Sequence, residues 1–175
     1  MNKKELSERD ICTKFITPAI EKAGWDIQSQ VREEVYFTDG RIYVRGNSTA
    51  RGQRKFADYI LYYRPNIPVA VIEAKDNNHS TGDGMQQALD YAGILDIPCV
   101  FSSNGDGFIF HNRSGDIVSE VSLPLDYFPS PEQLWSFYKQ FKGIETPDQE
   151  QVVSQDYYFD GSGRKPRYYQ QIAIN

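Results

Sequence analysis

The chain has 175 residues, 39% of them hydrophobic and 25% charged, with a formal net charge of −5. This length allows one domain of ordinary size with a real core, and the acidic balance excludes a uniformly basic nucleic-acid-binding coat. No apolar run is as long as a membrane helix, and residues 1–10 lack the apolar centre of a signal peptide, so we expect a cytoplasmic protein. Cys12 and Cys99 lie in apolar surroundings without Cys or His at ligand spacing, which favours core thiols over zinc or disulfides.

The first predicted element is a helix that begins after Ser7. Ser7 is a favourable N-cap residue, acidic side chains follow in the first turn, and apolar residues then recur at helical spacing. Pro18 can kink this helix and Gly24 ends it. Glu8, in the first turn, either complements the helix dipole or is a carboxylate aimed at a metal site, and the sequence leaves both interpretations open.

A hairpin is predicted next, with a strand-like segment over 25–37, a turn at 38–41 and a second strand over 42–44. The loop that follows is small, polar and basic. From residue 41 to residue 55 the chain has five basic residues and no acid: Arg41, Arg45, Arg51, Arg54 and Lys55. They either contact a phosphate backbone or belong to a merely soluble loop.

Residues 56–75 read as two apolar strands joined by a tight turn at 64–67. If the ladder folds symmetrically about that turn, it brings four pairs of residues opposite one another. These pairs are Tyr62 with Val69, Ile60 with Val71, Asp58 with Glu73, and Phe56 with Lys75.

Strand alternation then places Asp58, Glu73 and Lys75 on one face. Two carboxylates opposed across a ladder have Cβ atoms roughly 5 Å apart and destabilise the pair unless something compensates. A divalent cation would do so, and Lys75 would neutralise the remaining charge or hold a metal-bound water. A salt-bridged strand end is the alternative, but charge is costly in a strand with apolar neighbours on both faces. We therefore expect a metal site here.

A helix over 85–95 and an apolar strand over 97–103 complete a β-α-β unit, with the new strand parallel to the strand of Glu73. Gln87 and Tyr91 are four residues apart and share a helix face, so they point together at one target or are surface and core filler.

Neither of the two histidines is predicted to belong to the functional site. His79, in the loop before the helix, is expected to be solvated rather than a ligand. His111, at the end of an antiparallel strand over 108–111, has no evident partner in the sequence.

The last strong signal is a capping box at Ser130 with proline at the first helical position, which predicts a helix to about Lys142. We expect the first domain to span 1–143. Residues 144–175 read as an acidic linker, with five acids and no base from Glu145 to Asp160, and then the start of a second domain.

The order of the polar residues, Asp58, then Glu73-Ala-Lys75, then Gln87-x-x-x-Tyr91, on strand, strand and helix, resembles the PD-(D/E)XK nuclease superfamily. More narrowly, it resembles the N-terminal nuclease domain of the R subunit of type I restriction-modification enzymes. Ala57 departs from the pattern, because the family name has proline before the aspartate.

Both ends of the chain extend this resemblance. The opening helix with Glu8 is similar to that subgroup, and residues 166–174 are similar to the segment that opens its ATP-driven motor. There, Gln170 would contact the adenine of ATP in the full-length subunit.

The resemblance implies an α/β fold with a central mixed β-sheet flanked by helices. It implies that Asp58 and Glu73 bind Mg²⁺, with Glu8 as a further candidate ligand, and that Lys75 orients or polarises the attacking water. The Gln87 and Tyr91 pair would support the site or hold DNA.

The implied function is a Mg²⁺-dependent endonuclease that hydrolyses phosphodiester bonds of double-stranded DNA after the motor has pulled it. The implied partners are the methyltransferase (M) and specificity (S) subunits of the complex. The alternative, from a different functional class, is a non-catalytic DNA-binding or docking module that keeps the nuclease architecture.

Overall fold

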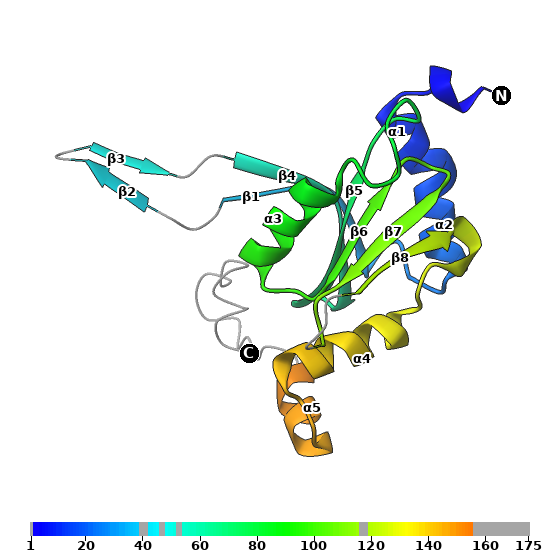
Figure 1. Ribbon diagram of the computed structural model, residues 1–175. Coiled ribbons are helices and arrows are strands. Elements are labelled where there is room, and N and C mark those ends of the chain that lie inside the picture. Colours follow the sequence, from blue (N-terminus) through cyan, green and yellow to red (C-terminus); the bar gives the residue numbers. More distant parts are fainter. Residues whose placement is uncertain (1, 39–41, 46–47, 52–53, 116–118, 156–175) are drawn as a thin grey trace.

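The structure, a computed structural model, describes residues 2–38, 42–45, 48–51, 54–115 and 119–155. Its centre is a mixed six-stranded sheet with the order β1-β4-β5-β6-β7-β8 (Figure 1). The strands of this sheet are β1 (Val31–Thr38), β4 (Arg54–Arg64), β5 (Ile67–Ala74), β6 (Cys99–Ser103), β7 (Gly107–Asn112) and β8 (Ser119–Pro124). Helices pack on both faces, so the α/β class predicted from the sequence is confirmed.

The helical segments come before, within and after the strands. They are η1 (Lys3–Glu5), α1 (Glu8–Ile11), the π-helical turn η2 (Cys12–Ile16), α2 (Thr17–Lys22), α3 (Met85–Leu95), η3 (Leu125–Tyr127), α4 (Pro131–Lys142) and α5 (Pro147–Ser154). Residues of α1, η2, α2 and α4 share one buried cluster with the sheet, whereas α3 packs into a second cluster with Ile60, Val71 and Val100. The sheet therefore has a separate apolar core on each face.

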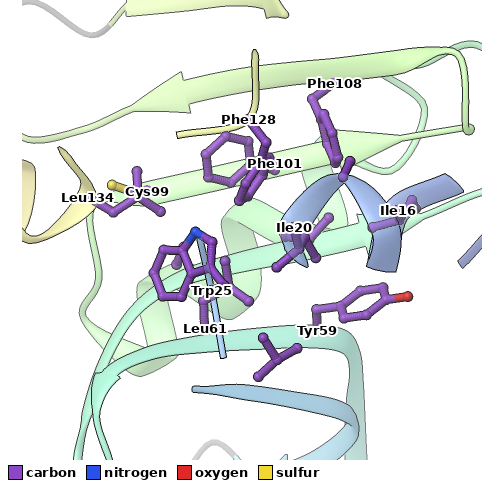
Figure 2. Close-up of a cluster of buried hydrophobic side chains, with 14 of the residues drawn as sticks. Ile16, Ile20, Trp25, Tyr59, Leu61, Cys99, Phe101, Phe108, Phe128 and Leu134 are labelled. Atoms are coloured by element: carbon purple, nitrogen blue, oxygen red, sulfur yellow. The ribbon is translucent and has the colours of Figure 1, made fainter. Parts of the chain in front are cut away.

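The larger core is aromatic, as Figure 2 shows for Trp25, Phe101, Phe108 and Phe128. The rings of Phe101 and Phe128 lie 4.8 Å apart, and the Trp25 indole donates a buried hydrogen bond of 2.8 Å to the carbonyl of Pro129. These contacts hold the segment before α4 against the sheet.

The predicted first helix is present, but as three consecutive segments. Ser7 caps α1 in a reciprocal capping box with Asp10, and Pro18 lies in the first turn of α2. Gly24, at φ 96°, follows α2 in the left-handed region, as expected for a helix end.

The predicted hairpin of residues 25–37 with 42–44 is wrong. β1 pairs antiparallel with β4, and β2 (Ile42–Arg45) instead pairs with β3 (Ser48–Arg51) in a separate two-stranded sheet. Figure 1 shows that this small sheet extends away from the body at the far end of β1 and β4. Pairing with β4 buries Val31 opposite Leu61, a gain from a distant segment that the local turn signal does not contain.

The hairpin of β4 and β5 is confirmed, but of its four predicted pairs only Ile60 with Val71 is observed. The ladder ends at Tyr59 with Ile72, so it contains neither Asp58 with Glu73 nor Phe56 with Lys75. Tyr62 lies opposite Pro68 rather than Val69, because the register shifts between Leu61 and Tyr62. Pro68 has no N–H to donate to the ladder, which suits an irregular pairing at this end.

The β-α-β unit is also as predicted, since β5 and β6 are parallel and joined by α3, and α4 begins with the predicted capping box at Ser130. Two elements were not expected. β8 pairs with β7 and supplies a partner for His111, whose Nδ1 lies 3.1 Å from Oε2 of Glu120. The other, α5, lies in the segment interpreted as a linker, where Thr146 forms a capping box with Gln149.

Within the described ranges, no helix is both long and apolar enough to cross a lipid bilayer.

Candidate active site

Four charged side chains meet where the middle of β4 and the end of β5 approach α1. The backbone N–H of Ala74 donates a 2.7 Å hydrogen bond to Oδ2 of Asp58, which holds the Asp58 carboxylate beside the end of β5. Nζ of Lys75 donates to Oε1 of Glu73 at 3.0 Å and lies 3.9 Å from Oε2 of Glu8. The structure thus brings together the three residues predicted from the hairpin and Glu8 of α1, the further candidate ligand.

Burial and mutual repulsion raise the pKa values of the acids in this cluster. The pKa of Glu73 rises from 4.5 to about 7, first because burial penalises its charge and second because the Asp58 carboxylate is close. Burial also raises the pKa of Asp58, and burial followed by the charge of Asp58 raises the pKa of Glu8. The site therefore holds more negative charge than its surroundings compensate.

Lys75 has the opposite tendency. Burial alone would lower the pKa of Lys75, but the hydrogen bond and charge of Glu73, together with Glu8 and Asp58, raise it above its usual value of 10.5. Lys75 is consequently an ammonium ion at neutral pH, able to donate hydrogen bonds but not to accept a proton.

The chemistry of the acids fits a hard cation. Glu73 is only 3% exposed, and its Oε2 is buried without a hydrogen-bond partner among the described residues. A buried carboxylate oxygen without a donor is costly unless a cation occupies its free side. The described residues contain no cluster of three or more Asp, Glu, His or Cys side chains close enough to hold a metal ion. Mg²⁺ is nonetheless commonly held by one or two carboxylates, with waters and substrate phosphate completing its shell.

A small cavity of about 70 Å³ opens beside this cluster. It lies between the first helical segments and the strands β1 and β4. Its lining consists of Glu8, Arg9, Cys12, Thr13, Glu33, Glu34, Asp58 and Tyr59. Asp58 thus faces a polar, open space on the side of the first helical segments.

The strand pair that carries Asp58 is irregular at that residue. The β1–β4 ladder contains the pairs Glu33–Tyr59 and Val35–Ala57 but not the pair between them, and Glu34 has φ 50°. Tyr59 packs into the larger core, whereas Ala57 packs with α3 on the other face, although residues two apart in a regular strand share a face. The strands therefore rotate at Glu34 and Asp58, and the sequence carried no signal of this, because glutamate is not typical of the left-handed region.

The α3 pair also lies against the site. Nε2 of Gln87 donates a 2.7 Å hydrogen bond to the hydroxyl of Tyr91, which confirms that the two share a helix face. Burial chiefly raises the pKa of Tyr91, and the charges of Glu73 and Asp58 add to the rise. The hydroxyl is therefore close enough to sense both carboxylates.

The other predicted basic residues lie on β2, β3 and the start of β4, or outside the described residues. Arg45 and Arg51 lie at the ends of β2 and β3, and Arg54 and Lys55 open β4. Arg41 and Gln170 lie outside the described residues, as do residues 156–175, the later part of the segment expected to hold the linker and the start of a second domain. His79 is half exposed, with its Nδ1 3.2 Å from Asp83 Oδ2, which agrees with a solvated residue.

Comparison with known proteins gives two informative matches. The chain is 51% identical over 178 aligned positions to the type I restriction enzyme EcoAI endonuclease subunit of Escherichia coli, in an alignment that covers 100% of this chain and 22% of that subunit. No protein-family profile matches the chain.

The structural match is to a fragment of an HsdR subunit assigned to a type I restriction enzyme of Vibrio vulnificus. The two folds superpose with a TM-score of 0.74 at 37% sequence identity, over 97% of this chain and 31% of that one. The chain thus spans well under half the length of the relatives it matches.

Proposed function

Because this chain belongs to the family of type I restriction enzyme endonuclease subunits, of which it spans a part, we propose that it is their DNA-cutting domain. The proposed reaction is Mg²⁺-dependent hydrolysis of phosphodiester bonds in double-stranded DNA. The observation that carries the proposal is the buried Oε2 of Glu73, which has no hydrogen-bond partner in the part of the chain that the structure describes and lies next to Asp58 and Lys75.

The chain's own residues account for most of the chemistry. Asp58 and Glu73 would hold the cation, with Glu8, whose Oε2 lies 3.9 Å from Nζ of Lys75, as an outer ligand. Once bound, Mg²⁺ would supply Lewis acidity at the scissile phosphate and a more acidic water. Lys75, kept protonated by the acids around it, would donate to the attacking water or to the developing negative charge on phosphate.

DNA would approach along the extended strands. The β2–β3 sheet and the start of β4 carry Arg45, Arg51, Arg54 and Lys55, and a two-stranded ribbon is narrow enough to enter a DNA groove. Cations on it would bind phosphates without reading sequence. Recognition of a DNA site, methylation and ATP-driven movement would then belong to the S and M subunits and to the rest of the full-length subunit, where Gln170 would contact ATP.

The test is cleavage of circular DNA by the full-length subunit assembled with its partners, with Mg²⁺ and ATP. Asp58→Ala, Glu73→Ala and Lys75→Ala should each abolish cutting while the complex still assembles and hydrolyses ATP. The matched control is Gly93→Ala on α3, where an added Cβ meets no described atom within 4 Å, and this variant should cut normally.

Normal cutting by any of the three alanine variants would contradict the assignment of that residue. If the wild-type complex does not cut at all, and the chain binds DNA but no Mn²⁺, it acts instead as a non-catalytic DNA-binding module. A Mn²⁺ titration of the wild type against Glu73→Ala separates these two outcomes.

A further inference from the structure

We propose that Gly84 is a positioning residue that fixes the Glu73 side chain, an inference that rests on the proposed metal site. Gly84 is the N-cap residue of α3 and is itself buried. A Cβ built on Gly84 would lie 2.9 Å from Cγ of Glu73, 3.2 Å from Cβ of Glu73 and 2.9 Å from Oγ of Ser102. Separations under 3.0 Å do not occur between real Cβ atoms and their neighbours, so the Glu73 methylene groups pack directly on the Gly84 backbone.

The need for glycine at this position is steric rather than conformational. Gly84 has φ −83° and ψ −8°, values that any L-residue adopts. The backbone freedom of glycine is therefore not used, and what remains is the absence of a side chain. At position 84 that absence leaves the space which Glu73 occupies.

Neither Glu73 nor Ser102 can move easily to make room for a methyl group at position 84. Glu73 and Ser102 are paired residues of the parallel strands β5 and β6, and their exposed fractions are 3% and 0%. Oγ of Ser102 accepts a 3.1 Å hydrogen bond from the N–H of Gly84, which ties the start of α3 to β6. The atoms of Glu73 in question are Cβ and Cγ, not the carboxylate end, so relief of the contact requires the whole side chain to rotate.

This contact has a consequence for the carboxylate. Glu73 is held between Lys75, which donates to Oε1, and Gly84, the N-cap residue of α3. A rotation that avoids a new methyl group would carry the carboxylate away from Asp58 and Lys75. Since a misplacement of about 1 Å at a catalytic group can cost on the order of a hundredfold in rate, the direct packing of Glu73 on Gly84 is a functional constraint.

Two measurements test the inference, with Gly93→Ala as the control in the same helix. The first is Mn²⁺ affinity, measured by calorimetry at neutral pH. Gly84→Ala should weaken Mn²⁺ binding at least tenfold, whereas Gly93→Ala should leave it unchanged. Wild-type Mn²⁺ affinity in a folded Gly84→Ala protein would overturn the inference.

The second measurement does not depend on a metal. In a double-mutant cycle without metal ions, Gly84→Ala should lower Tm much more when residue 73 is Glu than in the Glu73→Ala background, where the Cγ is gone. Failure to fold only in the Glu73 background supports the inference equally. An equal loss of Tm, or failure to fold, in both backgrounds would overturn it, because the methyl group would then be resisted by something other than Glu73.

The two measurements also separate this inference from the proposed function. If the wild type binds no Mn²⁺, the metal site is refuted, while the cycle still decides whether Gly84 supports Glu73.

Discussion

Replacing Glu73 by glutamine should remove a large part of the pH dependence of stability from the metal-free protein. Folding raises the pKa of this carboxyl group from 4.5 to about 7, mainly through burial and then through repulsion by Asp58. The folded state therefore binds a proton more tightly than the unfolded state between these two values. Below pH 4.5 Glu73 is protonated in both states, and the shift costs no stability. The free energy of unfolding falls as pH rises from 4.5 to about 7, above which Glu73 is ionised in the folded state as well.

The size of the effect follows from the shift. At 1.36 kcal/mol per pKa unit, a rise from 4.5 to about 7 corresponds to about 3 kcal/mol of lost unfolding free energy at pH 8. Glu73 is 3% exposed, so solvent screening does not reduce this figure much. Because Asp58 and Glu8 ionise in the same cluster, the quantity to compare is the difference in slope between two variants.

The assay is urea unfolding followed by circular dichroism from pH 5 to 8, in the presence of a chelator. Wild type should lose most of about 3 kcal/mol over this range through Glu73, and Glu73→Gln should not. Glu132→Gln, on the exposed surface of α4, is the control and should keep the wild-type slope. Equal slopes for wild type and Glu73→Gln would refute the argument that burial raises this pKa.

Three further predictions concern the strand beside the site, the larger core and the DNA interface. Glu34→Gly should be tolerated or stabilise the protein by up to about 1 kcal/mol in urea unfolding, because glycine accepts φ 50° without strain, whereas Glu33→Gly in the same strand should cost about 0.5–1 kcal/mol. Leu134→Ala should cost about 2–5 kcal/mol, since Leu134 is fully buried in the larger core, while Val152→Ala, 63% exposed, should change the unfolding free energy by less than about 0.5 kcal/mol. Arg51→Ala should weaken DNA binding equally on unrelated sequences, and the slope of log binding constant against log salt concentration should become shallower by about one. Fluorescence anisotropy at several salt concentrations measures this slope. An unchanged slope would show that Arg51 does not contact DNA.

The parts of the fold that the sequence predicts well are those set by local signals. The N-cap at Ser7 and the capping box at Ser130 mark two helix starts, and the turn at 64–67 joins the strands that carry Asp58 and Glu73. This turn predicts that Asp58, Glu73 and Lys75 come close together, but not the irregular pairing at Glu34 and Asp58 that sets how the Asp58 side chain lies.

The parts that the sequence does not predict depend on contacts between distant segments. β1 pairs with β4 rather than with β2, since the burial of Val31 against Leu61 outweighs the nearby turn. The left-handed Glu34 is a product of the same pairing. Gly84 was visible only as a loop residue, because its importance comes from the space that Glu73 and Ser102 occupy after folding.

The measurement that tests the metal site most directly is a crystal structure of the protein with Mn²⁺, read by anomalous scattering. We predict a Mn²⁺ ion bonded to both the Asp58 and Glu73 carboxylates, near the Lys75 ammonium, and its loss in Glu73→Ala crystals. Mn²⁺ bound elsewhere, with these two carboxylates free of metal, would contradict the proposed nuclease site.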